Sequence, residues 1–548
     1  MKRLLLLFFL LIGFCVGALY MTGAADDIRM KLADAMDEGE DTAPSVLAEG
    51  DVSADAMKEV RTAASEMGFI LNREMDAPLP PRIRIYVAGS QETYARVLAE
   101  HFSLTAKEAE EVAAISGGWS GGKRRVTAIN GASGVMKGRS DRIHTTGHEL
   151  FHQAQYALSE GKDTDEKALF WLEEGTADYM GALLAERMKG RSREKWIADI
   201  KVELLSAPKM VRMEDLQHLD FAERKHIMGK DYHAYSLADL MTWYLVRQLP
   251  EGTEGTHFVA YFRLLGTGVS GETAFEQVFG MKLDAFLAAF HAWWTAESSA
   301  PLAVRVEADE SVQPKYAQEI QKQVEFSRRL VEQRLGKRLH GTYALVLAGG
   351  KENFVRAISA RCDVDEAWAR ELAGASLWVE NGSMILLNAE ELTSPQQILF
   401  SMGTMMARVF ERQYMASDTE EPLWLVHGVS YLMGMEALSE SGYGAPRDYR
   451  RTWLLKLREA AAIPSLAALG DEADYRRAAE TYGNESVSLV MEVGAYELLS
   501  RGGWGAVSRW LGAVRESGDG KRAFESVWGI SAKDFADGVD RMIQGGAS

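Results

Sequence analysis

Residues 171–181 read WLEEGTADYMG, and residues 424–434 read WLVHGVSYLMG. Tryptophan, leucine, two glycines and a methionine occupy the same five places in both stretches, 253 residues apart. Only the first stretch is acidic, because its Glu173 and Glu174 are replaced by valine and histidine in the second. A phrase that recurs at long range indicates an internal repeat, and a repeat determines how the whole chain is divided.

Other short phrases recur at nearly the same separation. VAG at 87–89 matches LAG at 347–349, an offset of 260, and FG at 279–280 matches WG at 528–529, an offset of 249. The offset falls along the chain without reversing, which indicates a duplicated unit with small deletions in the second copy. The predicted divisions are residues 1–25 as a signal peptide or N-terminal anchor, 26–51 as an acidic tether, 52–297 as the first unit, 298–310 as a linker, and 311–546 as the second unit.

The N-terminus has the pattern of an export signal. A basic start, Met1–Arg3, precedes an uncharged run over residues 4–21 and small residues at 22–25. The run is nearly long enough to span a bilayer, so an uncleaved anchor formed by residues 4–21 is the alternative. We therefore expect an exported protein, in the periplasm or cell envelope or secreted, whose only membrane contact is this segment.

Composition agrees with a globular protein of several domains. The chain has 548 residues, too many for one ordinary core, and 47% of them are hydrophobic. Its net charge of −18, with acids and bases interspersed, argues against nucleic acid as a partner. Cleavage of the signal would leave Cys362 as the only cysteine, so no internal disulfide is expected.

Hydrophobic periodicity predicts an α+β fold for each unit, with a small sheet followed by a mostly helical part. In the first unit the predicted elements are a helix at 54–71, a strand at 83–87, a helix from about 91, a glycine-rich pair of strands within 116–129, long helices from about 140 and about 169, and further helices at 237–249 and 285–294. The second unit is expected to repeat this order, and the two repeats are expected to pair within the molecule.

The stretch TTGHELFHQAQ at 145–155 carries the strongest chemical signal. His148 and His152 are four residues apart, so on a helix both imidazoles leave one face and can meet one metal ion. Glu149 lies beside the first of them, placed to polarise a water on the metal. The alternative is an amphipathic helix with two partly buried histidines.

The first quoted phrase completes this pattern. A catalytic zinc needs three protein ligands, and Glu174 supplies the third from a second helix. Asp178 follows one turn later on the same face, where it can accept the second N–H of a ligating histidine, His148 by preference. Glu173 points elsewhere on the helix and is expected to lie outside the ligand set.

This arrangement resembles the gluzincin metallopeptidases of the thermolysin-like superfamily, the peptidase MA clan. The matching residues are His148, Glu149 and His152 of HELFH, with Glu174 and Asp178 of EEGTAD. The WL-x-EG-x-A form is most similar to the aminopeptidase-like branch. The resemblance implies Zn²⁺, hydrolysis of peptide or protein substrates, and a small sheet beside the active-site helix.

The resemblance extends over roughly residues 80 to 250 and suggests further roles. In the family an edge strand before the HExxH helix pairs with extended substrate, and GGWSGG at 117–122 is placed for this. Trp119 and Gly121 are its candidate substrate contacts, with a plain hairpin turn as the alternative.

The resemblance also implies a tyrosine as oxyanion donor, and Tyr235 is the candidate, with Tyr232 and His233 as rivals. The amine anchor of true aminopeptidases is not recognisable, so exo- and endo-cleavage both stay open. His144, one turn before His148, is expected to be a surface or capping histidine rather than a substrate contact.

The second unit cannot hold the same site. No histidine lies between His340 and His427, so an HExxH motif is impossible there. His427 stands in the place of Glu174, and Tyr431 in the place of Asp178. A degenerate, metal-free copy is therefore expected, with docking, cleft shaping or partner binding as its open roles.

These observations predict an exported zinc metallopeptidase in which Glu149 is the general base and one of two repeats is a pseudoenzyme. The alternative is a non-catalytic cell-envelope scaffold or binding protein built on a peptidase-like fold. Glu149 argues against that alternative, because a structural zinc site needs no base and is closed by a fourth ligand. Hydrolysis of a non-peptide amide is a third interpretation.

Overall fold

The structure is a computed structural model of the whole chain. It describes residues 43–102, 104–131, 138–163, 168–207, 210–217, 223, 233–415 and 422–545. The predicted signal segment, most of the predicted tether and Tyr232 lie outside these residues. Within the described ranges, none of the helices combines the length and apolar character needed to cross a bilayer.

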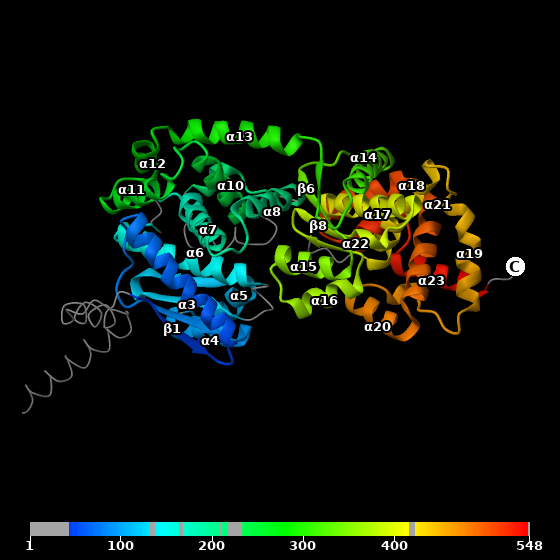
Figure 1. Cartoon of the computed structure of the whole chain (residues 1–548), viewed down its shortest axis with the longest axis horizontal. Helices are drawn as coiled ribbons and strands as arrows, with labels where there is room; N and C mark the ends of the chain where they lie inside the picture. The colour runs from blue at the N-terminus through cyan, green and yellow to red at the C-terminus, as the bar shows by residue number, and fades with distance from the viewer. Residues whose placement is uncertain are drawn as a thin grey trace, which may run out of the picture. The chain divides into compact units, whose positions relative to one another are not determined.

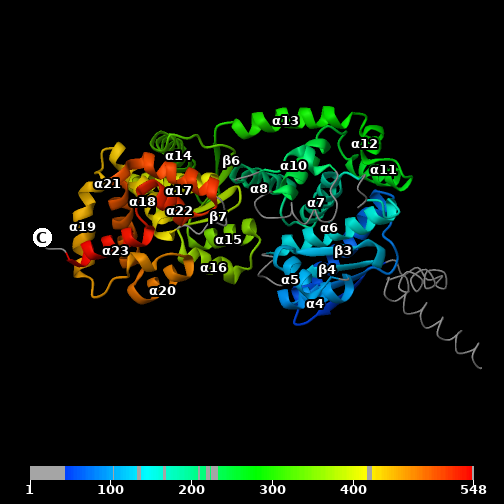
Figure 2. The same cartoon turned by 180° about the vertical axis from the view of Figure 1, so that it is seen from behind.

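The first sheet has four strands in the order β1-β2-β4-β3. β1 (Ser45–Glu49), β2 (Arg84–Ala88) and β4 (Val126–Asn130) are parallel, whereas β3 (Gly118–Gly121) runs antiparallel to β4 and forms one edge. The sheet lies between α6 on one face and the α4–α5 pair on the other (Figure 2). The strands predicted at 83–87 and within 116–129 are thus observed.

Helices make up most of the described chain (Figure 1). In chain order those of the N-terminal half are α3 (Ala54–Phe69), α4 (Gln91–Phe102), α5 (Ala106–Ile115), α6 (Arg139–Leu158), α7 (Phe170–Arg187), α8 (Arg193–Ser206), α10 (Ala234–Val246), α11 (Glu254–Gly266), α12 (Gly271–Phe279) and α13 (Leu283–Ser299). The helix predicted at 54–71 is α3, continued by a π-helical turn at Ile70–Glu74. The predicted long helices are α6 and α7.

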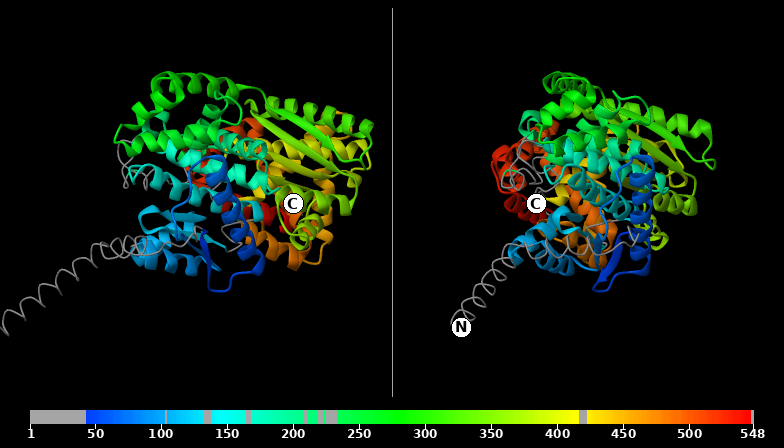
Figure 3. Two further views of the ribbon diagram at one scale, coloured as in Figure 1. Left: turned by 60° about the vertical axis from the view of Figure 1, so that its left-hand side comes forward. Right: turned by 90° about the vertical axis from the view of Figure 1, so that its left-hand side faces the viewer.

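The second sheet has the order β5-β6-β8-β7, with the same strand directions as the first (Figure 3). Its strands are β5 (Ala303–Ala308), β6 (Thr342–Ala348), β7 (Trp378–Asn381) and β8 (Met384–Asn388). The helices of this half are α14 (Pro314–Leu335), α15 (Lys351–Cys362), α16 (Glu366–Ala375), α17 (Pro395–Tyr414), α18 (Leu423–Glu440), α19 (Pro446–Glu459), α20 (Glu472–Tyr482), α21 (Asn484–Ser517), α22 (Gly520–Trp528) and α23 (Ala532–Gly545).

Elements of the two halves follow one another in the same order with a drifting separation. α4 begins at Gln91 and α15 at Lys351, 260 residues later. α12 begins at Gly271 and α22 at Gly520, 249 residues later. These two separations equal the largest and the smallest offsets between the recurring stretches of the sequence.

Two predicted connecting segments contain strands. β1 lies in the segment predicted as an acidic tether, and β5 lies in the segment predicted as a linker. Each adds a parallel strand to its sheet, through pairs such as Val46 with Ile85 and Val306 with Leu345. Main-chain pairing with a distant strand overrides the polar composition of these short segments, so each sheet begins earlier than the sequence indicates.

The described residues form two compact units. Unit 1 comprises the described residues up to Trp196 and those in the ranges Arg212–His226 and Leu237–Phe290. Unit 2 comprises the other described residues. The described residues of 197–211 thus fall in unit 2, whereas the sequence analysis placed them in the first unit. Asp199 explains part of this, because its carboxylate accepts hydrogen bonds from the Ser383 amide (2.7 Å) and hydroxyl (2.8 Å).

The two quoted phrases begin α7 and α18 and pack alike within their own units. The buried Trp171 ring stacks on Phe286 at 5.2 Å between centroids, and the buried Trp424 ring stacks on Phe535 at 5.7 Å. The shared tryptophan therefore anchors α7 and α18 to the last helices of their units, α13 and α23.

The last shared glycine of each phrase marks a close helix crossing. A Cβ at Gly181 would lie 2.6 Å from the His144 carbonyl oxygen of α6, and one at Gly434 would lie 2.7 Å from the Phe400 carbonyl oxygen of α17. Only glycine lets the two backbones approach this closely. The residues common to both phrases are thus framework residues.

Candidate metal centre

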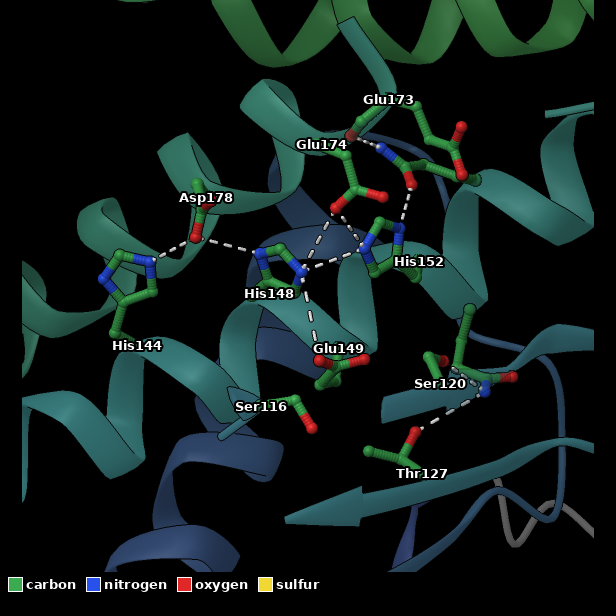
Figure 4. A network of polar contacts seen from close by, with 12 residues as sticks. Ser116, Ser120, Thr127, His144, His148, Glu149, His152, Glu173, Glu174 and Asp178 are labelled. Carbon is green, nitrogen blue, oxygen red and sulfur yellow. Dashed lines mark hydrogen bonds and ion pairs between the residues drawn. The ribbon is translucent and has the colours of Figure 1, made fainter. Parts of the chain in front are cut away.

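α6 and α7 bring three side chains of metal-ligand type together (Figure 4). The Nε2 atoms of His148 and His152 are 2.9 Å apart, because residues four apart share one face of α6. Glu174 Oε2 reaches from α7 to within 3.8 Å of the first nitrogen and 3.5 Å of the second. The ligand atoms of these three residues all lie within 4.8 Å of one another.

Asp178 holds the outer nitrogen of the first histidine. Its Oδ1 lies 3.0 Å from His148 Nδ1 and 2.8 Å from His144 Nε2. Asp178 therefore occupies the orienting place that its spacing suggested. His144 differs from the expected surface or capping histidine, since it is half-buried and its ring also packs at an angle against the Trp196 ring.

Gln155 holds the outer nitrogen of the second histidine, and the sequence reasoning missed it. Its Oε1 lies 2.6 Å from His152 Nδ1, and its Nε2 donates to the Glu173 carbonyl oxygen (2.8 Å) and to Thr176 Oγ1 (2.9 Å). The available signal was its position three residues after His152, which places it on the same side of α6. Glu173 itself is buried and is not among the three residues with ligand geometry.

The donor set fits a divalent metal of the zinc type. Because Nδ1 of His148 faces a carboxylate and Nδ1 of His152 faces an amide oxygen, each ring in its neutral form has its lone pair on Nε2. The 2.9 Å contact between the two Nε2 atoms is a hydrogen bond, which needs a proton on one of them, and a metal ion would take the place of that proton. Two nitrogens on one tetrahedral zinc lie roughly 3.3 Å apart, given bonds of about 2.0 Å.

Electrostatics in this cluster favour positive charge. Burial alone would lower the pKa of His152, but the Glu174 carboxylate and its hydrogen bond, together with Glu149, raise that pKa to about 10. Burial likewise opposes protonation of His148, yet Asp178 raises its pKa above the ordinary value. The cluster thus gathers protons, which a metal ion would displace on binding.

Glu149 lies beside the triad in a confined place. Its carboxyl is buried, its Oε1 is 3.9 Å from His148 Nε2, and burial raises its pKa. Gly118 of β3 covers it, because a Cβ at that position would lie 2.7 Å from Glu149 Oε1. A raised pKa suits a carboxylate that accepts a proton and later returns it.

The predicted substrate contacts on β3 lie on the face of the strand that points away from α6. Trp119 packs into the cluster between the sheet and the α4–α5 pair, and a Cβ at Gly121 would meet the Phe102 ring of α4. Side chains alternate along a strand, so the α6 face is presented by Gly118 and by Ser120, whose Oγ accepts from Gln153 of α6 (2.8 Å). Gly118 and Ser120 therefore present the α6 face of β3, and the roles of Trp119 and Gly121 as substrate contacts stay predictions.

The predicted oxyanion donor lies in the first turn of α10. Tyr235 falls in unit 2, whereas the triad falls in unit 1, so its role stays a prediction. The rival candidate His233 is hydrogen-bonded to a glutamate, since its Nδ1 lies 2.9 Å from Glu203 Oε1. The same oxygen accepts a hydrogen bond from Ser236 Oγ at 2.6 Å.

α17 and α18, which follow the second sheet as α6 and α7 follow the first, carry different chemistry. Arg408 stands at the place of His152, 256 residues on, and pairs with Glu411 at 3.3 Å. Glu411 also accepts from Ser430 Oγ at 2.8 Å. Burial and the nearby Arg408 lower the pKa of His427 to about 4, so this imidazole stays neutral.

Comparison with known proteins adds no assignment. No protein-family model matches the chain, and no curated protein matches it.

Proposed function

We propose that the chain is a zinc-dependent metallopeptidase whose centre is formed by α6 and α7 of unit 1. The observation that carries the proposal is the meeting of His148, His152 and Glu174 beside the buried Glu149. Two imidazoles and one carboxylate leave a fourth position for water or substrate, as in catalytic zinc sites. This is also the ligand set of the gluzincins.

We further propose that the chain arose by tandem duplication. Support comes from the identical strand orders of the two sheets and from the drift of the offset between corresponding elements. The second copy is a pseudoenzyme, because Arg408 and His427 stand where the first copy has His152 and Glu174. Its proposed roles are docking, cleft shaping or partner binding.

The residues of the centre divide the chemistry among them. Bound zinc would supply Lewis acidity toward a water molecule and a substrate carbonyl. Glu149 accepts the proton of the attacking water and returns it to the leaving amine. Asp178 keeps the imidazole of His148 in the ligating tautomer. The outer edge of β3 is the proposed pairing partner of an extended peptide, and Tyr235 is the proposed oxyanion donor.

The N-terminal segment gives the proposed location. A basic start and an apolar run over residues 4–21 support export to the cell envelope or beyond, with cleavage or anchoring as the two fates. The proposed partners are peptide or protein substrates.

A scaffold function is the competing proposal. It predicts a structural or empty site, in which a buried carboxylate next to the ligands has no use. Glu149 is that carboxylate, so its substitution separates the two functions.

The test is metal analysis of the exported chain followed by digestion of a peptide library. One zinc per chain is expected, together with cleavage that is lost in Glu149→Gln while the zinc is kept. Undiminished cleavage by Glu149→Gln would rule out the mechanism. No metal and no cleavage would favour the scaffold.

A further inference from the structure

Gln155 contacts a ligand without belonging to the predicted motif. It is fully buried, and all its polar atoms have partners on α6 or α7. The question is what a neutral amide does at this place, since an amide can offer either its oxygen or its nitrogen to His152.

The partners on α7 settle which end faces the histidine. The Glu173 carbonyl oxygen can only accept, so the amide nitrogen of Gln155 must point toward it (2.8 Å). Thr176 Oγ1 donates to the Leu172 carbonyl oxygen (2.6 Å), which leaves its lone pair to accept the second N–H of the amide (2.9 Å). Both amide hydrogens are therefore used on α7.

The amide oxygen is thereby turned toward His152. An amide oxygen can only accept, so Nδ1 of His152 must carry a hydrogen (2.6 Å). In a neutral imidazole the lone pair then lies on Nε2, the atom that faces His148 and Glu174. The main-chain carbonyl oxygens of α7 thus fix the direction of each hydrogen bond in the series that leads from Leu172 through Thr176 and Gln155 to His152.

The corresponding place in unit 2 is consistent with this role, if the two units are repeats. Gln155 corresponds to Glu411, 256 residues on, and Thr176 to Val429, 253 residues on. Glu411 is paired with Arg408, which stands at the place of His152. The amide and the hydroxyl that anchors it are thus absent where the ligand is absent.

We propose that Gln155 is a positioning residue, which fixes His152 in the tautomer that presents Nε2 to a metal ion. Because the amide of Gln155 is hydrogen-bonded to α7, the helix that carries Glu174 also determines which ring nitrogen of His152, on α6, carries the hydrogen. The inference rests on the proposed metal centre and adds a residue to it. It complements Asp178, which does the same for His148 through a carboxylate.

The chain contains a matched control for this residue. Gln153 is also fully buried on α6, but its Nε2 donates to Ser120 Oγ (2.8 Å) and to the Val126 carbonyl oxygen (3.1 Å), away from the ligands. Gln153→Met and Gln155→Met remove the same amide from the same helix. Packing losses should therefore be similar in both variants.

The experiment measures zinc affinity of the full chain by competition with a chelator, and the absorption spectrum of the Co²⁺-loaded protein. Gln155→Met should weaken zinc binding by about 10- to 100-fold and change the Co²⁺ spectrum, as loss of an outer partner of a ligand does. Gln153→Met should keep wild-type zinc affinity and the wild-type spectrum.

Equal affinities of Gln155→Met and wild type would overturn the inference, and so would equal weakening in both methionine variants. If Gln155→Met does not fold, Thr176→Val decides: weaker zinc binding supports the role, and unchanged binding contradicts it. A wild-type chain that takes up no zinc would remove the proposed metal centre itself, and this inference with it.

Discussion

The helix pair α6–α7 and the helix pair α17–α18 use one packing scheme for two kinds of interior. In both, a tryptophan stacks on a phenylalanine of the last helix, and a glycine allows a close crossing. Between the shared residues, α6–α7 gathers histidines and carboxylates, whereas α17–α18 has an internal Arg408–Glu411 pair.

This difference shows how a polar interior is neutralised in each case. The carboxylates around His148 and His152 favour positive charge in this interior, because they raise the pKa of both imidazoles. In α17 the cation is part of the chain, since Arg408 reaches Glu411 one turn away. In unit 2 the Arg408 side chain thus supplies the positive charge that a bound metal ion would supply in the proposed centre of unit 1.

The largest expected effect comes from placing an arginine, like Arg408 of α17, at position 152 of α6. His152→Arg should abolish stoichiometric zinc binding, because a guanidinium stays protonated and cannot be a ligand. Peptidase activity should fall by more than the roughly 10²- to 10⁴-fold that general-base catalysis alone contributes. Metal content and peptide cleavage of the purified chain are the measurements.

Arg408→His is the reciprocal control. It should gain no zinc, since α17 would still have Thr404 and Met405 at the places of His148 and Glu149. Zinc retained by His152→Arg, or acquired by Arg408→His, would contradict the account of how the two pairs differ.

A smaller effect, equal in both units, is expected from the shared framework. Trp171→Ala and Trp424→Ala should each destabilise their own unit by about 3–5 kcal/mol, as loss of a buried aromatic ring does. Hydrogen exchange of α7 and α18 peptides from the full chain measures each unit separately. A tryptophan that can be removed at little cost would show that the two phrases do not share a packing role.

The sequence predicted much of this comparison because its signals are local or repeated. The spacing of His148 and His152 determines their common face on any helix, and Asp178 follows Glu174 by one turn for the same reason. The duplicated phrase located the framework, because the residues common to both copies are those that touch neighbouring helices.

The remainder depended on contacts that spacing does not determine. β1 and β5 are strands only because distant strands pair with them. The direction of Trp119 follows from strand register, where a shift of one residue reverses the face. The role of Gln155 depends on the Glu173 carbonyl oxygen, and a main-chain atom leaves no mark in the sequence.

The smallest effect concerns the buried acid of the second pair. Burial raises the pKa of Glu411 to about 7, although Arg408 and Ser430 oppose the shift. An unfolded glutamate ionises near pH 4.5, so between that pH and about 7 folding requires Glu411 to take up a proton. The free energy of unfolding should therefore fall as the pH rises through this window.

Glu411→Gln places in α17 the amide that α6 has at Gln155, and it removes this pH dependence. Relative to wild type, the variant should gain about 2 kcal/mol of unfolding free energy between pH 5 and pH 8. The measurement is hydrogen exchange of α17 and α18 peptides at both pH values, corrected for intrinsic rates. Glu371→Gln is the control, because that exposed glutamate loses little hydration on folding. Parallel pH profiles for Glu411→Gln and wild type would mean that the buried charge in unit 2 is fully compensated, and the contrast with the proposed metal-binding pair α6–α7 would then rest on the ligands alone.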